Sequence, residues 1–272
     1  MLLTDWGDMG HWQYLPVSYA GYAAGGGLSW NSKSAKNLPL NTFLNSYVFR
    51  DGSSIMGDLV LDMGRYNMFE EFNMFNMTTT NMFLQFGLRD KIMVNEIFDK
   101  IVYGLSDLMK DVAPEMITGF KENYNNRRPF DYKGLKNFID SKENLLSRTK
   151  IQTADSLLIR DEYFNSFRLV KLGADLQNYI QNRNSMNSDE EKTLLRTMKD
   201  MGNQYLSENK RLWLLRDKPG GYNRSTMALN TLLQQINDRI LLLDKSSLAQ
   251  SLNRFLEKVG TAGAVLYLKS AK

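Results

Sequence analysis

The sequence predicts a mainly helical protein, with β-strand confined to two short segments near the N-terminus. From Pro39 onward, apolar residues recur three or four positions apart, which is the spacing of one face of a helix. In residues 1–30, short apolar or glycine-rich runs alternate instead with polar sequence that glycines interrupt, which is typical of strands that open into loops. The chain has 272 residues, 43% of them hydrophobic, so a sizeable core is expected.

The first predicted strand covers residues 1–4, and the loop that follows it, residues 5–16, is the most informative stretch of the chain. It holds two tryptophans, two aspartates, a tyrosine, a glutamine and the only histidine. Aromatic faces beside carboxylates suit a sugar, because the C–H face of a pyranose lies on an indole and its hydroxyls donate to Asp. The alternative is a buried aromatic turn whose polar groups are satisfied internally.

A short helix or turn is predicted for residues 17–25, and the second strand for residues 26–30. Glycine in a strand allows close packing against a neighbouring helix. Residues 31–37 are rich in Ser, Lys and Asn and are expected to form a loop.

Helices are predicted for most of the remaining chain, beginning with Pro39, which suits a first helical position. The predicted helical segments are 41–49, 55–66, 92–112, 134–149, 153–184, 188–216, 225–243 and 247–259. Ser54, Ser225 and Ser247 are candidate N-caps, and Ser188 with Glu191 reads as a capping box. Residues 67–82 alternate Met and Phe with Asn, which fits either a half-buried helix or a packed loop.

The break Asp-Lys-Pro-Gly-Gly at residues 217–221 separates two long apolar stripes. Two helices joined by so short a connection predict an antiparallel hairpin, with Leu212 and Leu229 in one core.

Composition argues against several classes of function. Net charge is only +4, which does not favour nucleic acid or an anionic membrane surface as a partner, and no apolar run has membrane-spanning length. No Cys, a single His and no EF-hand loop leave no basis for a metal or other cofactor. The three glycines at 25–27 lack the Lys-Ser/Thr of a phosphate loop.

No signal peptide is visible, which favours a cytoplasmic location.

Two segments resemble a known family. Residues 5–16 (Asp-Trp-Gly-Asp-Met-Gly-His-Trp-Gln-Tyr-Leu-Pro), followed by 25–30 (Gly-Gly-Gly-Leu-Ser-Trp), resemble the end of the barrel in bacterial β-N-acetylhexosaminidases of glycoside hydrolase family 20. Residues 211–222 (Arg-Leu-Trp-Leu-Leu-Arg-Asp-Lys-Pro-Gly-Gly-Tyr) are similar to a motif late in the helical region that follows that barrel.

The resemblance implies a domain division. Residues 1–38 would be the last two β/α units, strands seven and eight, of a (β/α)8 barrel, and residues 39–272 a helical domain whose part 39–90 is a candidate to pack on the barrel. A barrel needs about 250 residues, so the chain is expected to be the C-terminal part of a longer protein.

The resemblance also implies an activity, removal of terminal N-acetylhexosamine from glycans by substrate-assisted retaining hydrolysis. The family's His-x-Gly-Gly-Asp-Glu motif, with its catalytic Asp-Glu pair, does not occur. Two adjacent Asp-Glu pairs do occur, Asp161-Glu162 and Asp189-Glu190, but both lie in segments predicted to be helical. They are interpreted as residues on solvated helix faces. This chain alone is therefore predicted to be inactive, with no catalytic residue of its own.

What remains of the implied site is a sugar-pocket wall. Its candidate residues are Trp6, Asp8, Trp30, Asp5, His11 and Trp12. Trp30 matches the family's Trp that closes the hydrophobic box, unless it is a barrel-core residue, and Asn31 stands where a Glu is expected. Asp5 or Asp8 would accept from a sugar hydroxyl, and Trp6 would replace the family's Tyr.

The two remaining candidates have weaker roles. His11 is expected to make an orienting hydrogen bond rather than act as acid or base, because no nucleophile is near it in sequence. Trp12 fits an outer subsite or simple packing of the loop equally well.

The rival interpretation is a non-catalytic helical protein-interaction module, because amphipathic helices dominate the chain after Pro39. A surface apolar groove would favour that module, and a closed aromatic pocket near Trp6 and Trp30 would favour the sugar site.

Overall fold

The computed structural model describes residues 10–35, 37–72 and 78–245. Within these ranges the chain forms helices, turns and loops without a β-strand, apart from one isolated bridge between Asp51 and Ile151. The mainly α class is therefore confirmed. The predicted strand at residues 1–4 lies outside the described residues.

The second predicted strand is wrong, and with it the barrel units lose their support in the described chain. Residues 26–30 form the end of helix α1 (Tyr19–Trp30), where the hydroxyl of Ser29 donates to the carbonyl oxygen of Gly25 at 2.7 Å. A strand must pair its backbone groups with another strand, and the described residues offer none beside this segment. The glycines and alanines therefore satisfy their backbone groups within one helix.

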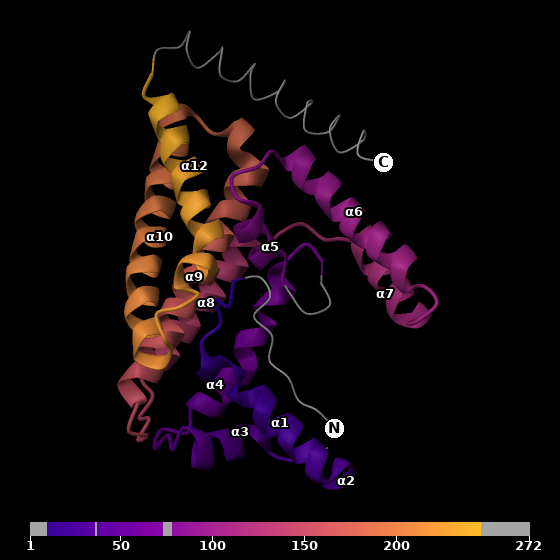
Figure 1. Ribbon diagram of the computed structural model, residues 1–272, viewed down its shortest axis with the longest axis vertical. Coiled ribbons are helices and arrows are strands. Elements are labelled where there is room, and N and C mark those ends of the chain that lie inside the picture. The colour runs from indigo at the N-terminus through magenta and orange to yellow at the C-terminus, as the bar shows by residue number, and fades with distance from the viewer. Residues whose placement is uncertain (1–9, 36, 73–77, 246–272) are drawn as a thin grey trace.

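Figure 1 shows the order of the elements along the chain. They are η1 (Leu15–Ser18), α1 (Tyr19–Trp30), α2 (Ser32–Ala35), α3 (Leu40–Phe43), η2 (Leu44–Val48), α4 (Met56–Met63), η3 (Gly64–Phe69), α5 (Thr79–Phe86), α6 (Lys91–Met109), α7 (Pro114–Asn125), α8 (Tyr132–Ser147), α9 (Ser156–Asn182), η4 (Arg183–Ser185), α10 (Ser188–Arg216), α11 (Tyr222–Ser225) and α12 (Met227–Leu243).

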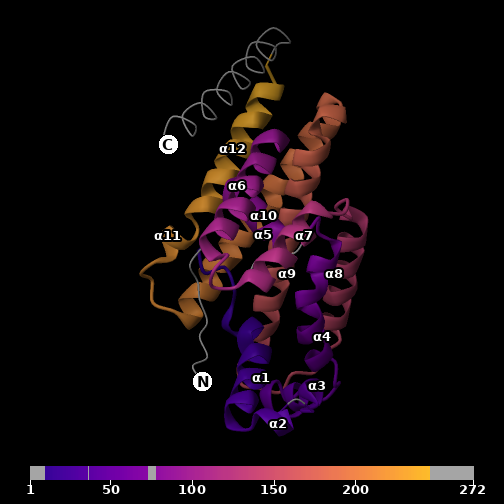
Figure 2. The same cartoon turned by 90° about the vertical axis from the view of Figure 1, so that its right-hand side faces the viewer.

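Helix α9 is the element on which the others pack. Tyr163 and Phe167, in its first half, belong to a core shared with α4 and α8. Tyr179 and Ile180, in its second half, belong to a core shared with α5, α6, α10 and α12. The long axes of α9, α10 and α12 run side by side, and α6 with α7 stands out from this body (Figures 1 and 2). One helix thus joins two cores.

Helices α10 and α12 form the predicted antiparallel hairpin. Lys192, near the start of α10, pairs with Asp244 just after α12 at 3.0 Å. Further along α10, Lys199 Nζ donates to Asn237 Oδ1 at 2.7 Å, so the contacts run in opposite directions along the two helices. Leu212 and Leu229 are both buried, but of the two only Leu229 belongs to the core around Tyr179 and Ile180, so their predicted placement in one core is not confirmed.

The capping box at the start of α10 lies one residue earlier than predicted. The side chain of Asn187 accepts from the backbone N–H groups of Asp189 and Glu190, and Glu190 accepts from the backbone of Asn187. Asn187 has the extended backbone of an N-cap, whereas Ser188 is already helical. Glu191, predicted to cap, instead turns inward and accepts from Arg239 and Tyr179.

Ser54 does not cap α4. Its φ is +57°, and the carboxylate of Asp51 accepts instead from the backbone N–H groups of Ile55 and Met56, both at 2.9 Å. A charged acceptor satisfies helix-start donors better than a hydroxyl does, because charge-assisted hydrogen bonds are stronger. The last predicted helix, 247–259 with Ser247 as its cap, lies outside the described residues.

Candidate functional site

The segment that begins at Gly10 is held against the turn between α10 and α12. The indole Nε1 of Trp12 donates to the carbonyl oxygen of Ser225 at 2.8 Å, and the Ser225 hydroxyl donates to the carbonyl oxygen of Gly10. Ser225, predicted as a cap, thus serves as an anchor. Gly10 has φ +110°, and a Cβ there would lie 2.7 Å from Trp12 Nε1, so only glycine fits this close approach.

Tyr14 anchors the same segment to the core. Its hydroxyl accepts from the side-chain Nδ2 of Asn165 at 2.7 Å and of Asn209 at 2.9 Å. Burial raises the pKa of Tyr14 to about 12, although the hydrogen bonds from the two asparagines oppose this shift. Two residues later, the carbonyl oxygen of Pro16 accepts from the hydroxyl of Tyr163 at 2.8 Å. Backbone and side chains of the segment are therefore tied to both α9 and α10.

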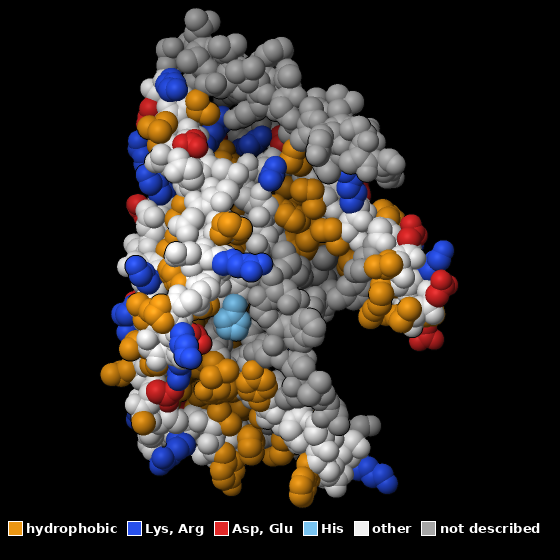
Figure 3. Space-filling view, viewed as in Figure 1, with side chains coloured by type: hydrophobic (Ala, Val, Ile, Leu, Met, Phe, Trp, Pro, Cys, Tyr) orange, Lys and Arg blue, Asp and Glu red, His pale blue; other side chains and the backbone are white. Residues whose placement is uncertain are grey.

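An aromatic contact joins residues 10–16 to residues 211–222. The ring of His11 meets the edge of Trp213 with centroids 6.2 Å apart, and Trp213 meets Tyr222 at 5.7 Å. Trp213 Nε1 donates to the carbonyl oxygen of Lys218, which fixes the indole at the glycine turn. The single histidine is exposed, and Figure 3 shows its pale-blue side chain at the surface.

Three of the six predicted sugar-site residues, Trp30, His11 and Trp12, lie in the described part of the chain. Asp5, Trp6 and Asp8 lie outside the described residues. Trp12 is 7% exposed and packs in the core, and Trp30, at the end of α1, is 93% exposed.

Among the described residues, Trp30 makes no ring contact with Trp12 or His11. The side chain of Asn31, which the resemblance places where a Glu is expected, is used locally. The side chain of Asn31 accepts from the backbone N–H groups of Lys33 and Ser34 and so caps α2.

The two Asp-Glu pairs differ from each other. Asp189 and Glu190 are exposed at the start of α10, as expected. Glu162 is fully buried, so its assignment to a solvated face is wrong. Its two carboxylate oxygens each accept from the guanidinium of Arg216 at 2.8 Å, in the bidentate geometry that arginine favours.

Arg216 also binds Asp155 at 2.8 Å. Burial alone would raise the pKa of the Asp155 carboxyl, but hydrogen bonds from Arg216 and Thr153 and the charge of Arg216 together outweigh it and hold that pKa below its ordinary value. Hydrogen bonding to Glu162, above all, raises the pKa of Arg216. The cluster is an ion-paired brace between α9 and α10, in which Arg216 engages both carboxylate oxygens of Glu162.

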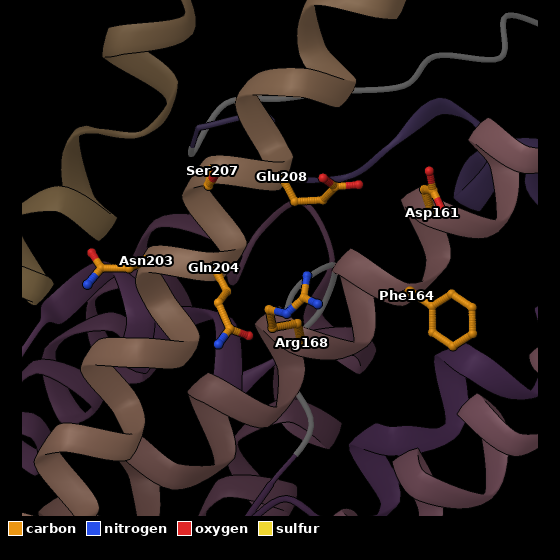
Figure 4. A pocket seen from close by; sticks show the side chains of 7 residues that line it. All are labelled: Asp161, Phe164, Arg168, Asn203, Gln204, Ser207 and Glu208. Atoms are coloured by element: carbon orange, nitrogen blue, oxygen red, sulfur yellow. The ribbon is translucent and has the colours of Figure 1, made fainter.

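A cleft between α9 and α10 was not predicted from the sequence. It has a volume of about 480 Å³. Figure 4 shows Asp161, Phe164 and Arg168 projecting from α9. From α10, Asn203, Gln204, Ser207 and Glu208 line the opposite wall. Residues four apart on a helix share a face, so the sequence did contain one signal for this wall. Positions 203 and 207, and positions 204 and 208, place polar residues on one face of α10.

A second cleft of about 520 Å³ continues the first toward α8. It shares Phe164, Arg168 and Gln204 with the first cleft and extends to Glu143 and Lys171. The Lys171 ammonium lies 2.7 Å from both Asp140 and Glu143. Together the two clefts make one groove along α9 and α10, polar apart from the ring of Phe164 and the side chain of Met201.

No group of three or more His, Asp or Glu side chains in the described ranges is placed to hold a metal ion. Among these same residues, no helix combines the length and apolar character needed to cross a bilayer. Comparison of the chain with protein-family models, with curated proteins and with solved structures finds no match.

Proposed function

We propose that the chain belongs to a glycan-processing hydrolase of the β-N-acetylhexosaminidase type, in which the helical body holds the sugar-contacting segment 5–16 in place. One observation carries the proposal. The two segments that resemble this family, 5–16 and 211–222, are about 200 positions apart in the sequence, yet His11 of one lies on Trp213 of the other.

The anchoring supports a binding role for the residues just upstream of Gly10. A loop presents binding side chains reproducibly only when a rigid scaffold holds its base. Trp12 and Tyr14 supply that base, since both are buried and both are hydrogen-bonded to the body of helices. Asp5, Trp6 and Asp8 immediately precede this anchored base in the sequence.

The exposed indole of Trp30 is consistent with the same role. An indole face is a good surface for the C–H groups of a sugar ring. Trp30 is 93% exposed on α1, and Tyr19 and Ala20 of that helix pack on the core around Tyr163.

The proposed contribution of this chain is binding and positioning, and not acid catalysis. The family's Asp-Glu motif is absent from the sequence, and the buried Glu162 is held by Arg216. A general acid would have to come from elsewhere in the complete enzyme, because substrate-assisted hydrolysis needs a proton for the leaving oxygen.

The four tryptophan indole N–H signals allow a direct test by NMR. N-acetylglucosamine titrated into the labelled chain should shift the signals of Trp6 and Trp30. The signals of Trp12 and Trp213 should stay in place, because their Nε1 groups are bonded to Ser225 and Lys218. Asp8→Ala should weaken the binding. A titration that moves none of the four signals would contradict the proposal.

The second candidate is a non-catalytic helical interaction module. Exposed leucines near the end of the α9–α10 pair favour it, since Leu157 is 73% exposed and Leu215 is 59% exposed. Selective binding of a helical peptide, without any response to N-acetylglucosamine, would make this module the better account.

A further inference from the structure

We propose that the groove between α9 and α10 binds a neutral oligosaccharide, at a site separate from the exposed indole of Trp30. The inference starts from Arg168, which projects into the groove between Gln204 and Phe164 (Figure 4). The choice of an N-acetylated test sugar rests on the proposed function, whereas the site itself is argued from its lining residues.

Arg168 is half-buried yet has no carboxylate within ion-pair distance among the described residues. Its Nη1 donates to Asn165 Oδ1 at 2.5 Å, and its other N–H groups find no partner in the described part of the protein. By contrast, Arg211 and Arg216, on the facing helix, are both ion-paired. Partly buried arginines are normally paired, so the free donors of Arg168 are available to a ligand.

The facing wall supplies further polar groups, on solvent-exposed side chains that are open to a ligand. The side chains of Asn203, Gln204 and Ser207 make no hydrogen bond with any described residue. Amide and hydroxyl groups both donate and accept, which is what the vicinal hydroxyls of a sugar require.

Phe164 adds an apolar face to this polar lining. Its ring is half-buried, belongs to the edge of the core shared by α4, α8 and α9, and is common to both clefts. An aromatic ring beside planar polar side chains fits the two kinds of surface of a pyranose.

Charge decides between a neutral and an acidic ligand. Asp161 and Glu208 stand on the rim, and both are paired with Arg211. The hydrogen bond from Arg211, aided by the charges of Arg211 and Arg168, lowers the pKa of Glu208, which therefore stays ionised. With Glu143 and Asp200 on the second cleft, the groove is not positive overall, so it does not favour an anion.

The size of the groove fits more than one sugar unit. Each cleft, at about 480 and 520 Å³, falls in the range of small-molecule sites, about 300–1,000 Å³, and the two are continuous through Arg168. Both are open, so affinity is expected to be weak, with a Kd of about 0.1–10 mM.

The test is a titration of the full chain with triacetylchitotriose, followed by the NMR signals of the Arg168 Nε–H and the Gln204 side-chain amide. Both signals should shift and saturate. Arg168→Ala and Phe164→Ala should each weaken binding by ~10-fold or more. Arg196→Ala, an exposed arginine of α10 outside the groove, is the matched control and should bind like the wild type. Far-UV spectra like that of the wild type at the titration temperature would show that the variants fold, although Phe164→Ala, at the edge of a core, should melt earlier.

Three results would overturn the inference: no shift of the groove signals, saturable shifts that Arg168→Ala leaves unchanged, or a response only to a uronic-acid disaccharide. The two sites can fail independently. A shift of the Trp30 indole without groove shifts supports the proposed function alone, and groove shifts without a Trp30 response support the groove alone.

Discussion

The indole Nε1 of Trp12 donates to the carbonyl oxygen of Ser225, 213 positions further along the chain, at 2.8 Å. This bond closes the turn between α10 and α12 over the N-terminal segment. A buried carbonyl that loses its donor retains its desolvation penalty. The bond should therefore stabilise the folded chain and not merely accompany folding.

Trp12→Phe tests that contribution. Phenylalanine keeps most of the aromatic packing but cannot donate to Ser225, so the free energy of unfolding should fall by about 1–3 kcal/mol. Urea denaturation followed by circular dichroism measures the loss. Trp30→Phe is the control and should have no effect, because that side chain is 93% exposed. Equal stability of the two variants would show that the Trp12–Ser225 bond contributes nothing.

The glycine turn gives a prediction that separates two neighbours. Gly221 has φ +89°, and a Cβ there would only touch Trp213 at an ordinary 3.9 Å, so the penalty of Gly221→Ala is in the backbone. The free energy of unfolding of Gly221→Ala, measured by thermal melting, should therefore be about 1–2 kcal/mol lower than that of the wild type. Gly220→Ala meets nothing within 4 Å and should be neutral or slightly stabilising. Identical melting temperatures for both variants would rule out a special role for Gly221.

Asp51 makes stability depend on pH. Burial alone would raise the pKa of the Asp51 carboxyl, but hydrogen bonds from Ser53, Met56 and Lys150 outweigh it and hold the pKa below its ordinary 3.8. A lowered pKa in the folded state means that Asp51 contributes stability above pH 3.8, and that this contribution is lost as the pH falls through the folded value.

The free energy of unfolding of Asp51→Asn should therefore be about 1–3 kcal/mol below that of the wild type at pH 7. This difference should become smaller in acid, because the wild type then loses the contribution of the ionised carboxylate. Urea titrations between about pH 2 and pH 7 measure it. The exposed Asp217→Asn serves as control. A difference in unfolding free energy that stays constant across this pH range would mean that ionisation of Asp51 is not coupled to folding.

Catalysis gives a further prediction. Purified chain should not release nitrophenol from an aryl β-N-acetylglucosaminide, because loss of a general acid lowers the rate by about 10²–10⁴-fold. Turnover that copurifies with the protein would refute this. It would direct attention to Asp5 and Asp8.

The helices could be predicted from the sequence because their stripes are governed by local spacing. The prediction of the α10–α12 hairpin rested on two runs of periodically spaced apolar residues separated by a Pro-Gly-Gly break, and the antiparallel arrangement is confirmed. The caps were harder, because Asn187 and Ser188 are both good cap residues and the choice depends on which one is extended.

The remaining errors concern contacts that are distant in the sequence. The strand predicted at residues 26–30 rested on a short glycine-rich run and on a family resemblance, yet a strand needs a paired neighbour that no local pattern reveals. Glu162 was assigned to solvent because nothing in its own helix predicts Arg216, 54 positions away. The α9–α10 groove depends on how two helices align, which spacing within one helix does not determine.

The central claim is that the helical body holds the N-terminal segment in a sugar-binding position. The most direct measurement is the Kd for N-acetylglucosamine of Gly10→Ala beside that of the wild type. A Cβ at Gly10 would lie 2.7 Å from Trp12 Nε1 and 2.8 Å from the Ser225 carbonyl oxygen, so the anchor must open. Gly21→Ala on α1, where a Cβ meets nothing within 4 Å, is the control.

The account predicts that Gly10→Ala weakens binding by ~10-fold or more, while the far-UV spectrum of the helices and the affinity of Gly21→Ala stay at wild-type values. An unchanged Kd for Gly10→Ala, in a variant whose Trp12 indole signal has moved, would contradict it, because the segment would then bind sugar without the helical body holding it.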